Sequence, residues 1–116
     1  MGAIGLPGDW TSQSRFIRTV FTRNNSVSGN TETESVSQFF HILDSVTQIK
    51  GCCELENNKY EITIYSSCCN ADKGIYYYTT YYNRQITGVN IFAENLDSEN
   101  LIRYGLVKSQ QFKMQN

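Results

Sequence analysis

The hydrophobic and polar positions along the chain predict two helices followed by a run of strands. A loop through Gly5–Asp9 leads to Thr11, which is well suited to cap a helix. Four apolar residues then form one stripe at helical spacing: Phe16, Ile17, Val20 and Phe21. We therefore predict a first helix from Thr11 to near Asn24, followed by a polar loop that extends to Asn30.

A second and stronger helical pattern begins near Thr33. Thr31-x-x-Glu34 and Ser35-x-x-Gln38 both have the spacing of a capping box, in which a side chain and the backbone satisfy each other's hydrogen bonds. Apolar residues then recur at helical spacing: Val36, Phe39, Phe40, Leu43 and Val46. Because Gly51 is a natural helix stop, we expect this helix to reach Lys50.

The rest of the chain favours strands, since it alternates apolar and polar residues and is rich in Tyr and Thr. The predicted strands are Tyr60–Tyr65, Ile75–Tyr82, Ile86–Phe92 and an edge strand Leu101–Val107. The turns that join them are predicted at residues 68–74, 83–85 and 97–100. The predicted fold class is thus α+β, with two helices followed by an antiparallel strand meander.

The second of these strands carries apolar or aromatic side chains on both faces. Ile75, Tyr77 and Tyr81 alternate with a second set, Tyr76, Tyr78 and Tyr82. A sheet of this kind requires a covering layer on each side. Two helices can cover only one side, so the pattern indicates that a further layer belongs to the fold.

Composition narrows the possible functions. The 116 residues allow one domain, and 10 Lys and Arg balance 11 Asp and Glu, which argues against a general nucleic-acid binder. No apolar run approaches the length of a membrane-spanning helix. The first seven residues lack the basic region of a signal peptide. We therefore expect a cytoplasmic protein that binds neither nucleic acid nor membrane.

The cysteines and the single histidine offer little chemistry by themselves. Cys52-Cys53 and Cys68-Cys69 are adjacent pairs, whose side chains point to opposite faces of an extended segment and are poorly spaced for zinc. We expect reduced thiols, one packed and one partly exposed in each pair. His41 lies mid-helix with no nucleophile beside it in the sequence, so we interpret it as structural. No metal or organic cofactor is implied.

The candidate site residue is Arg15. A rigid Gly-Leu-Pro-Gly-Asp loop running into a helix start fixes the side chains of the first turn. Arg15 is then a guanidinium on a stiff base, suited to holding a thiolate, a carboxylate or an oxyanion. The alternative is an ordinary surface ion-pair residue.

The chain resembles the choloylglycine hydrolase family, which includes conjugated bile salt hydrolases and penicillin V acylases. The motifs that carry the resemblance are Gly5-Leu6-Pro7-Gly8-Asp9-Trp10-Thr11, Ser14-Arg15-Phe16, Ser37-Gln38-Phe39-Phe40-His41-Ile42-Leu43, Ser67-Cys68-Cys69-Asn70, Asp72-Lys73-Gly74-Ile75-Tyr76-Tyr77-Tyr78 and Asn83-x-Gln85-Ile86. They cover essentially the whole of residues 1–116 and are closer to the bile salt hydrolase branch. The chain is therefore expected to be a single region, the carboxy-terminal part of such a domain.

The resemblance implies an N-terminal-nucleophile hydrolase, an αββα sandwich of which this chain would form part. In that family a cysteine at the processed amino terminus attacks an amide carbonyl, its own α-amino group handles the proton, and an arginine stabilises the thiolate. By motif position Arg15 corresponds to that arginine. The implied substrate is a conjugated bile salt or another N-acyl amide, and the implied assembly is a homo-oligomer, a tetramer in the family.

The chain departs from the family at the nucleophile. Removal of Met1 exposes Gly2, which has no nucleophilic side chain, and all four cysteines are internal. The leading expectation is a fragment of a bile salt hydrolase that is inactive alone. The alternatives are half of a split enzyme, a penicillin V acylase-like amidase and a non-catalytic interaction module.

Overall fold

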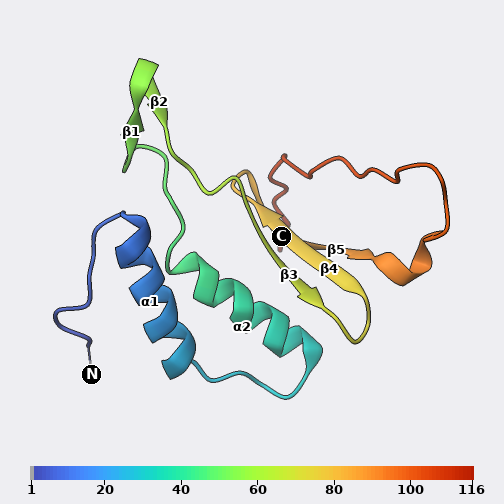
Figure 1. Cartoon of the computed structure of the whole chain (residues 1–116), viewed down its shortest axis with the longest axis horizontal. Helices are drawn as coiled ribbons and strands as arrows, with labels where there is room; N and C mark the ends of the chain where they lie inside the picture. The colour runs from blue at the N-terminus through green and yellow to red at the C-terminus, as the bar shows by residue number, and fades with distance from the viewer. Residues whose placement is uncertain (1) are drawn as a thin grey trace. The chain divides into compact units, whose positions relative to one another are not determined.

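The structure, a computed structural model, describes residues 2–116 and divides into two compact units. The first unit ends at Thr63 and contains the helices and a small hairpin. The second, Ile64–Asn116, contains a three-stranded sheet and the carboxy-terminal segment. Figure 1 shows the elements of both units. The order of two helices followed by antiparallel strands confirms the predicted fold class.

Both predicted helices form, and their starts are confirmed. Helix α1, Ser12–Asn25, is capped by Thr11, whose side chain accepts a hydrogen bond from the Ser14 N–H. Helix α2, Glu32–Asp44, begins with the complete capping box of Thr31 and Glu34. The two helices pack against each other (Figure 1).

The predicted end of the second helix is wrong, because α2 stops at Asp44 and not at Lys50. The last carbonyls of α2 accept short-range hydrogen bonds: the hydroxyl and the N–H of Ser45 both donate to the Ile42 carbonyl. The Val46 and Thr47 N–H groups likewise donate three residues back. These bonds end the helix before two β-branched residues, whose side chains fit a helix less well. Val46 to Lys50 is therefore free to pack as a loop.

The strand predicted at Tyr60–Tyr65 is also wrong. A short hairpin forms here from β1, Glu54–Leu55, and β2, Lys59–Tyr60, and it includes only Tyr60 of the predicted strand. Tyr65, the last residue of the predicted strand, begins the next strand of the structure. The intervening backbone bonds to loops, since Glu61 N–H donates to the Cys53 carbonyl and Thr63 N–H to the Gln48 carbonyl. Its alternation of apolar and polar residues does not correspond to one buried face, since Ile64 is exposed and the polar Thr63 is half-buried.

The sheet of the second unit is a meander in the order β3–β4–β5. Its strands are β3, Tyr65–Asn70, β4, Ile75–Thr80, and β5, Asn83–Asn90, all antiparallel (Figure 1). Cys68 and Cys69 lie in β3, so the predicted turn at 68–74 shortens to residues 71–74. It ends at Gly74, whose φ of +62° and close contact with the Phe92 ring disfavour a larger residue. The second turn falls at 81–82, two residues earlier than predicted.

The predicted edge strand Leu101–Val107 does not form among the described residues, where this segment is irregular. Side chains at the β4–β5 turn hold it instead of a strand ladder. The Thr80 hydroxyl donates to the Val107 carbonyl at 2.8 Å, and the Asn83 amide donates to the Ser109 carbonyl at 2.6 Å. Asn83 is 3% exposed, so these bonds are shielded from water.

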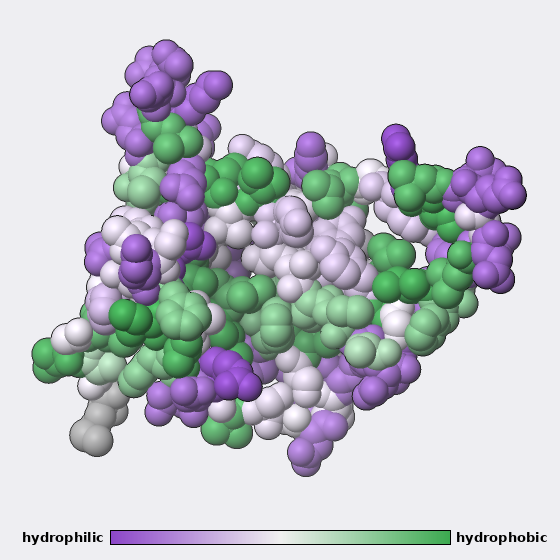
Figure 2. Space-filling view, viewed as in Figure 1, coloured by the Kyte–Doolittle hydropathy of each residue, from purple (hydrophilic) through white to green (hydrophobic). Residues whose placement is uncertain are grey.

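Few apolar side chains are buried by the chain's own residues. In residues 2–116 the buried apolar side chains are Phe40 in the first unit and Tyr78 in the second, each 6% exposed. The predicted stripe of α1 is largely open, and its Phe16 is 69% exposed. Apolar residues are accordingly prominent on the face that Figure 2 shows. Apolar surface on this scale is typical of a segment that packs against further protein.

Candidate functional site

The candidate site is built on the loop that leads into α1. Gly5 has a φ of +91°, a conformation that glycine adopts without strain, and a turn bond joins the Leu6 N–H to the Ala3 carbonyl at 3.1 Å. The ring of Pro7 fixes the φ angle of that residue. The loop is thus pre-shaped by local chemistry before it reaches the helix cap.

Asp9 joins this loop to the first turn of α1. Its Oδ1 accepts hydrogen bonds from the N–H of Thr11 at 2.8 Å and from the Thr11 hydroxyl at 2.5 Å, and its Oδ2 accepts from the Ser14 hydroxyl at 2.5 Å. These bonds, first of all that from Ser14, lower the pKa of Asp9 to about 2. Asp9 is therefore a carboxylate at neutral pH, and it fixes the residue directly before Arg15.

Arg15 is half-buried and oriented from outside its own helix. Its Nε donates to the carbonyl oxygen of Val46 at 3.0 Å, in the loop that follows α2. This bond sets the plane of the guanidinium group. Within residues 2–116, the two terminal Nη groups of Arg15 have no hydrogen-bond partner. The side chain is therefore held at one edge and presents charged N–H donors at its end.

Arg18, one turn further along α1, has a different task. Its Nη1 donates to the Pro7 carbonyl at 2.9 Å and to the Asp9 carbonyl at 2.6 Å. Its guanidinium carbon lies 6.0 Å from the centre of the Trp10 ring, at the limit of a cation–π contact. Arg18 thus clamps the loop through its terminal Nη1, whereas Arg15 is held through Nε and keeps both terminal Nη groups without a partner within residues 2–116.

Sequence reasoning missed Gln48, which was predicted to lie in a helix. It is 3% exposed, and its Nε2 donates to the Trp10 carbonyl at 3.4 Å. Its backbone N–H donates to the Thr63 hydroxyl at 2.8 Å. No local pattern could have found it, because its partners lie 38 and 15 residues away in the chain.

The remaining candidates are separate from this loop. His41 is exposed on α2. Cys52 and Cys69 are exposed, Cys53 and Cys68 are half-buried, and all four are free thiols. Burial raises the pKa of Cys68, which makes it a weaker nucleophile at neutral pH. In the described part of the chain no group of His, Cys, Asp or Glu side chains is placed to hold a metal ion, and no helix is long and apolar enough to span a membrane.

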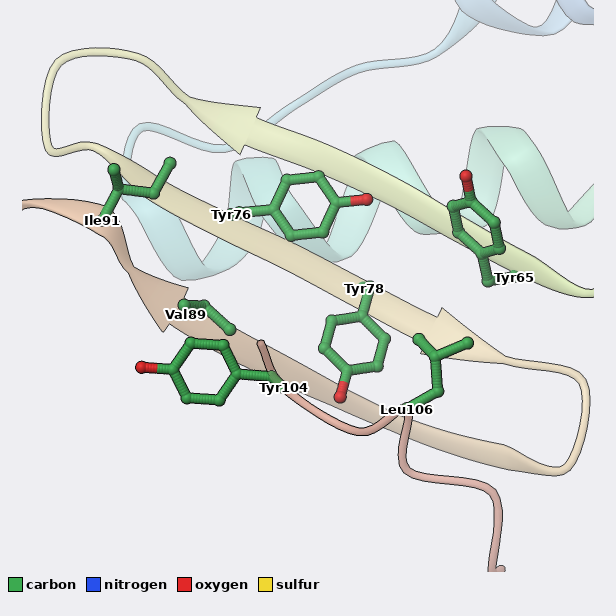
Figure 3. A pocket seen from close by; sticks show the side chains of 7 residues that line it. All are labelled: Tyr65, Tyr76, Tyr78, Val89, Ile91, Tyr104 and Leu106. Atoms are coloured by element: carbon green, nitrogen blue, oxygen red, sulfur yellow. The ribbon is translucent and has the colours of Figure 1, made fainter. Parts of the chain in front are cut away.

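The second unit contains an aromatic pocket of about 320 Å³ (Figure 3). Tyr76 and Tyr78 of β4 line it together with residues of β3 and β5, of the turn after β5 and of the carboxy-terminal segment, namely Tyr65, Val89, Ile91, Tyr104 and Leu106. Its walls are predominantly apolar, and within residues 2–116 no Lys, Arg, His, Asp or Glu side chain lines it. Apart from the hydroxyls of its tyrosines, the pocket therefore offers apolar surface for packing.

Comparison with known proteins gives one consistent family. The model of the linear amide C–N hydrolases, choloylglycine hydrolase family, matches residues 1–104. The bile salt hydrolase/transferase of Lactiplantibacillus plantarum is 58% identical over 97% of this chain, and that of Clostridium perfringens is 41% identical over 89%. The match covers 35% and 31% of those proteins, so the chain spans about a third of the curated relatives' length.

Solved structures agree. A cysteine-to-alanine mutant of the conjugated bile acid hydrolase from Clostridium perfringens matches all of this chain and 35% of its own, with a TM-score of 0.86 and 38% identity. The penicillin V acylase of Agrobacterium tumefaciens matches 77% of this chain and 28% of its own, with a TM-score of 0.62 and 16% identity, a likeness of fold alone. The predicted membership of the N-terminal-nucleophile hydrolase fold is confirmed.

Proposed function

This chain belongs to the choloylglycine hydrolase family of linear amide C–N hydrolases, and we propose on that basis that it forms part of an enzyme that hydrolyses conjugated bile salts. The bond cleaved is the amide that joins a bile acid to glycine or taurine. The identity with the Lactiplantibacillus plantarum relative, over nearly the whole chain, carries this proposal. Bile salts are favoured over penicillin V because the acylase shares only the fold.

The role proposed for Arg15 is to stabilise the thiolate that attacks the amide. A fixed guanidinium with free donors lowers the free energy of a nearby anion, and it does so most strongly where water is excluded. The Nε bond to Val46 and the unoccupied Nη groups fit this role. Arg18 fits it less well, because one of its two terminal groups, Nη1, is committed to the Pro7 and Asp9 carbonyls.

The nucleophile itself comes from outside these 116 residues in this proposal. An N-terminal nucleophile uses its own α-amino group as the base, and the four cysteines here are internal. The thiolate adds to the amide carbonyl, the C–N bond breaks as glycine or taurine leaves with a proton, and water hydrolyses the thioester. The part of the family domain that carries the nucleophile is either joined to this chain or associates with it as a separate polypeptide.

The test is a chimera in which this chain replaces the matching third of the Lactiplantibacillus plantarum relative. We expect it to release free glycine or taurine from conjugated bile salts. The chain alone is expected to release neither, and the chain mixed with the remaining two thirds of the relative tests assembly from two polypeptides. The native relative is the positive control.

Each arm has a decisive result. A folded chimera without activity would overturn the proposed function. Release by the isolated chain would show that the nucleophile lies within residues 1–116, contrary to the proposal. Activity of the mixture would establish that two separate polypeptides suffice. An active chimera with an inactive mixture would indicate that the two parts must belong to one continuous chain. Penicillin V hydrolysis faster than bile salt hydrolysis would favour the acylase alternative.

A further inference from the structure

Gln48 is a buried polar residue tied to two distant parts of the first unit. Its backbone is held on both sides by Thr63: the Gln48 N–H donates to the Thr63 hydroxyl at 2.8 Å, and the Thr63 N–H donates to the Gln48 carbonyl at 3.2 Å. Its side chain donates to the Trp10 carbonyl at 3.4 Å. Gln48 therefore links the loop after α2 with the linker to the second unit and with the start of α1.

This link lies two residues from the group that orients Arg15. The Val46 carbonyl is the acceptor that fixes the Arg15 guanidinium plane, and a shift of the loop would move that acceptor. Apart from the bond between the Val46 carbonyl and Arg15, the bonds of the Ser45 to Thr47 backbone within residues 2–116 are short-range ones to the end of α2. Gln48 is thus the first residue after Val46 whose contacts fix the loop relative to α1.

Stability alone does not explain a glutamine here. The Oε1 of Gln48 is fully buried and has no hydrogen-bond partner within residues 2–116. A buried acceptor without a donor destabilises a fold, and an apolar side chain of similar size at this position would avoid that penalty. What the glutamine provides and an apolar side chain could not is its directional bond to the Trp10 carbonyl.

We propose that Gln48 is a positioning residue that holds the Val46–Gln48 loop against the start of α1 and thereby aims Arg15 at the nucleophile. The proposal rests on the proposed function of Arg15. Gln48 touches neither substrate nor reacting atoms in this account, and it acts entirely through the Arg15–Val46 bond.

The experiment compares variants of the active chimera. Gln48→Leu removes the bond to Trp10 together with the orphan acceptor, and Thr63→Val, nearly the same size, removes the acceptor of the Gln48 N–H. We expect each to lower kcat by about ten- to hundredfold with little change in KM, the range seen when supporting contacts of a site are lost. The acid limb of the kcat/KM profile is expected to move to higher pH, because a misplaced Arg15 stabilises the thiolate less.

Gln13→Leu is the matched control, since it makes the same replacement at an exposed position of α1 and should leave kcat and the pH profile unchanged. Gln48→Leu is expected to keep the thermal midpoint within about 3 °C, because it removes an unsatisfied acceptor. In an Arg15→Ala background, Gln48→Leu is expected to cause no further loss. The double variant therefore separates positioning from general damage.

Several results would overturn the proposal. If Gln48→Leu shows an unchanged kcat and an unchanged acid limb of the kcat/KM profile while Arg15→Ala is inactive, the role of Gln48 is refuted. The role of Arg15 would stand in that case. Independent, multiplying losses in the double variant would also refute the role of Gln48. If Gln48→Leu fails to fold, Thr63→Val decides, since normal kinetics in that variant would exclude the positioning role. A fully active Arg15→Ala would overturn the proposed function of Arg15 itself.

Discussion

Truncation of Arg15 is expected to separate catalysis from stability. Arg15→Ala removes one structural hydrogen bond, from Nε to the Val46 carbonyl at 3.0 Å. A bond from a charged donor contributes about 1.5–3 kcal/mol when well shielded, and half-burial places this one near the lower end, at about 1–2 kcal/mol. Domains are commonly stable by about 5–15 kcal/mol, so the variant should remain folded.

The expected loss of turnover is much larger than this structural effect. Removal of one group that stabilises a reacting anion commonly costs about 10²–10³-fold in kcat, which corresponds to about 2.7–4 kcal/mol. Arg15→Lys should recover only part of it, because a lysine cannot donate to Val46 and present further planar N–H donors at the same time. The assay is release of glycine from a glycine-conjugated bile salt by the chimera, with the thermal midpoint measured in parallel.

Arg23→Ala supplies the comparison. Arg23 is an exposed arginine of the same helix, and its Nη1 makes a long hydrogen bond to the Asn24 side chain at 3.4 Å. We expect its turnover to match that of the parent. The assignment of Arg15 would be refuted if kcat of Arg15→Ala stayed within about threefold of the parent, far below the loss of a charge-stabilising group. A loss of turnover that merely followed a collapse of the thermal midpoint would refute it too.

Four further outcomes follow from individual contacts of the chimera. Arg18→Ala should lower stability by about 1–3 kcal/mol and speed proteolysis in residues 5–9, because two loop carbonyls lose their donor; a midpoint equal to that of Arg23→Ala would contradict this. The pKa of Asp9 in the folded state, about 2, lies below its ordinary value. The ionised Asp9 therefore adds to the free energy of unfolding above pH of about 4, and this contribution is lost as the pH falls towards 2. The difference in thermal midpoint between the parent and Asp9→Asn should therefore narrow on acidification, and a constant difference would exclude the linkage. Thr31→Ala should destabilise by about 1 kcal/mol through loss of the capping box, whereas the exposed Thr33→Ala should not, as compared by urea unfolding. Asn83→Ala should release residues 104–110 to protease faster than the parent, and an unchanged cleavage rate would show that the remaining bonds, that of Thr80 among them, suffice to hold them.

The elements predicted correctly from sequence are those specified by neighbouring residues. The caps of α1 and α2 depend on side chains within three residues of the helix start, Thr11 in one case and Thr31 with Glu34 in the other. The strand at Ile75–Thr80 was recognisable because Tyr and Thr favour a pleated surface. Family motifs likewise identified Arg15 as the candidate residue, a prediction that awaits the assay above.

The errors fall where distant contacts override local pattern. Helical spacing through Val46 predicted a helix to Lys50, yet tight bonds from Ser45 end α2 at Asp44. The linker before β3 alternates like a strand and bonds to the Cys53 and Gln48 carbonyls instead of a neighbouring strand. Turn positions slipped by two or three residues, because the register of a sheet depends on the partner strand as well as on turn chemistry. The burial of Gln48 could not be predicted for the same reason, since its partners are remote in sequence.

Arg15 and Arg18 make different hydrogen bonds, and the sequence motif has to be combined with the geometry to assign each of them a role. The two arginines are three residues apart on α1, so helical spacing alone places them near one another and assigns them no distinct tasks. The loop before the helix distinguishes them, because its Pro7 and Asp9 carbonyls accept hydrogen bonds from Arg18. Among the described residues, the hydrogen-bond partner of the Arg15 side chain is the Val46 carbonyl, which is in reach because α2 ends early. The early end of α2 therefore does more than shorten a helix: it creates the loop whose carbonyl leaves the end of the Arg15 guanidinium oriented and unoccupied.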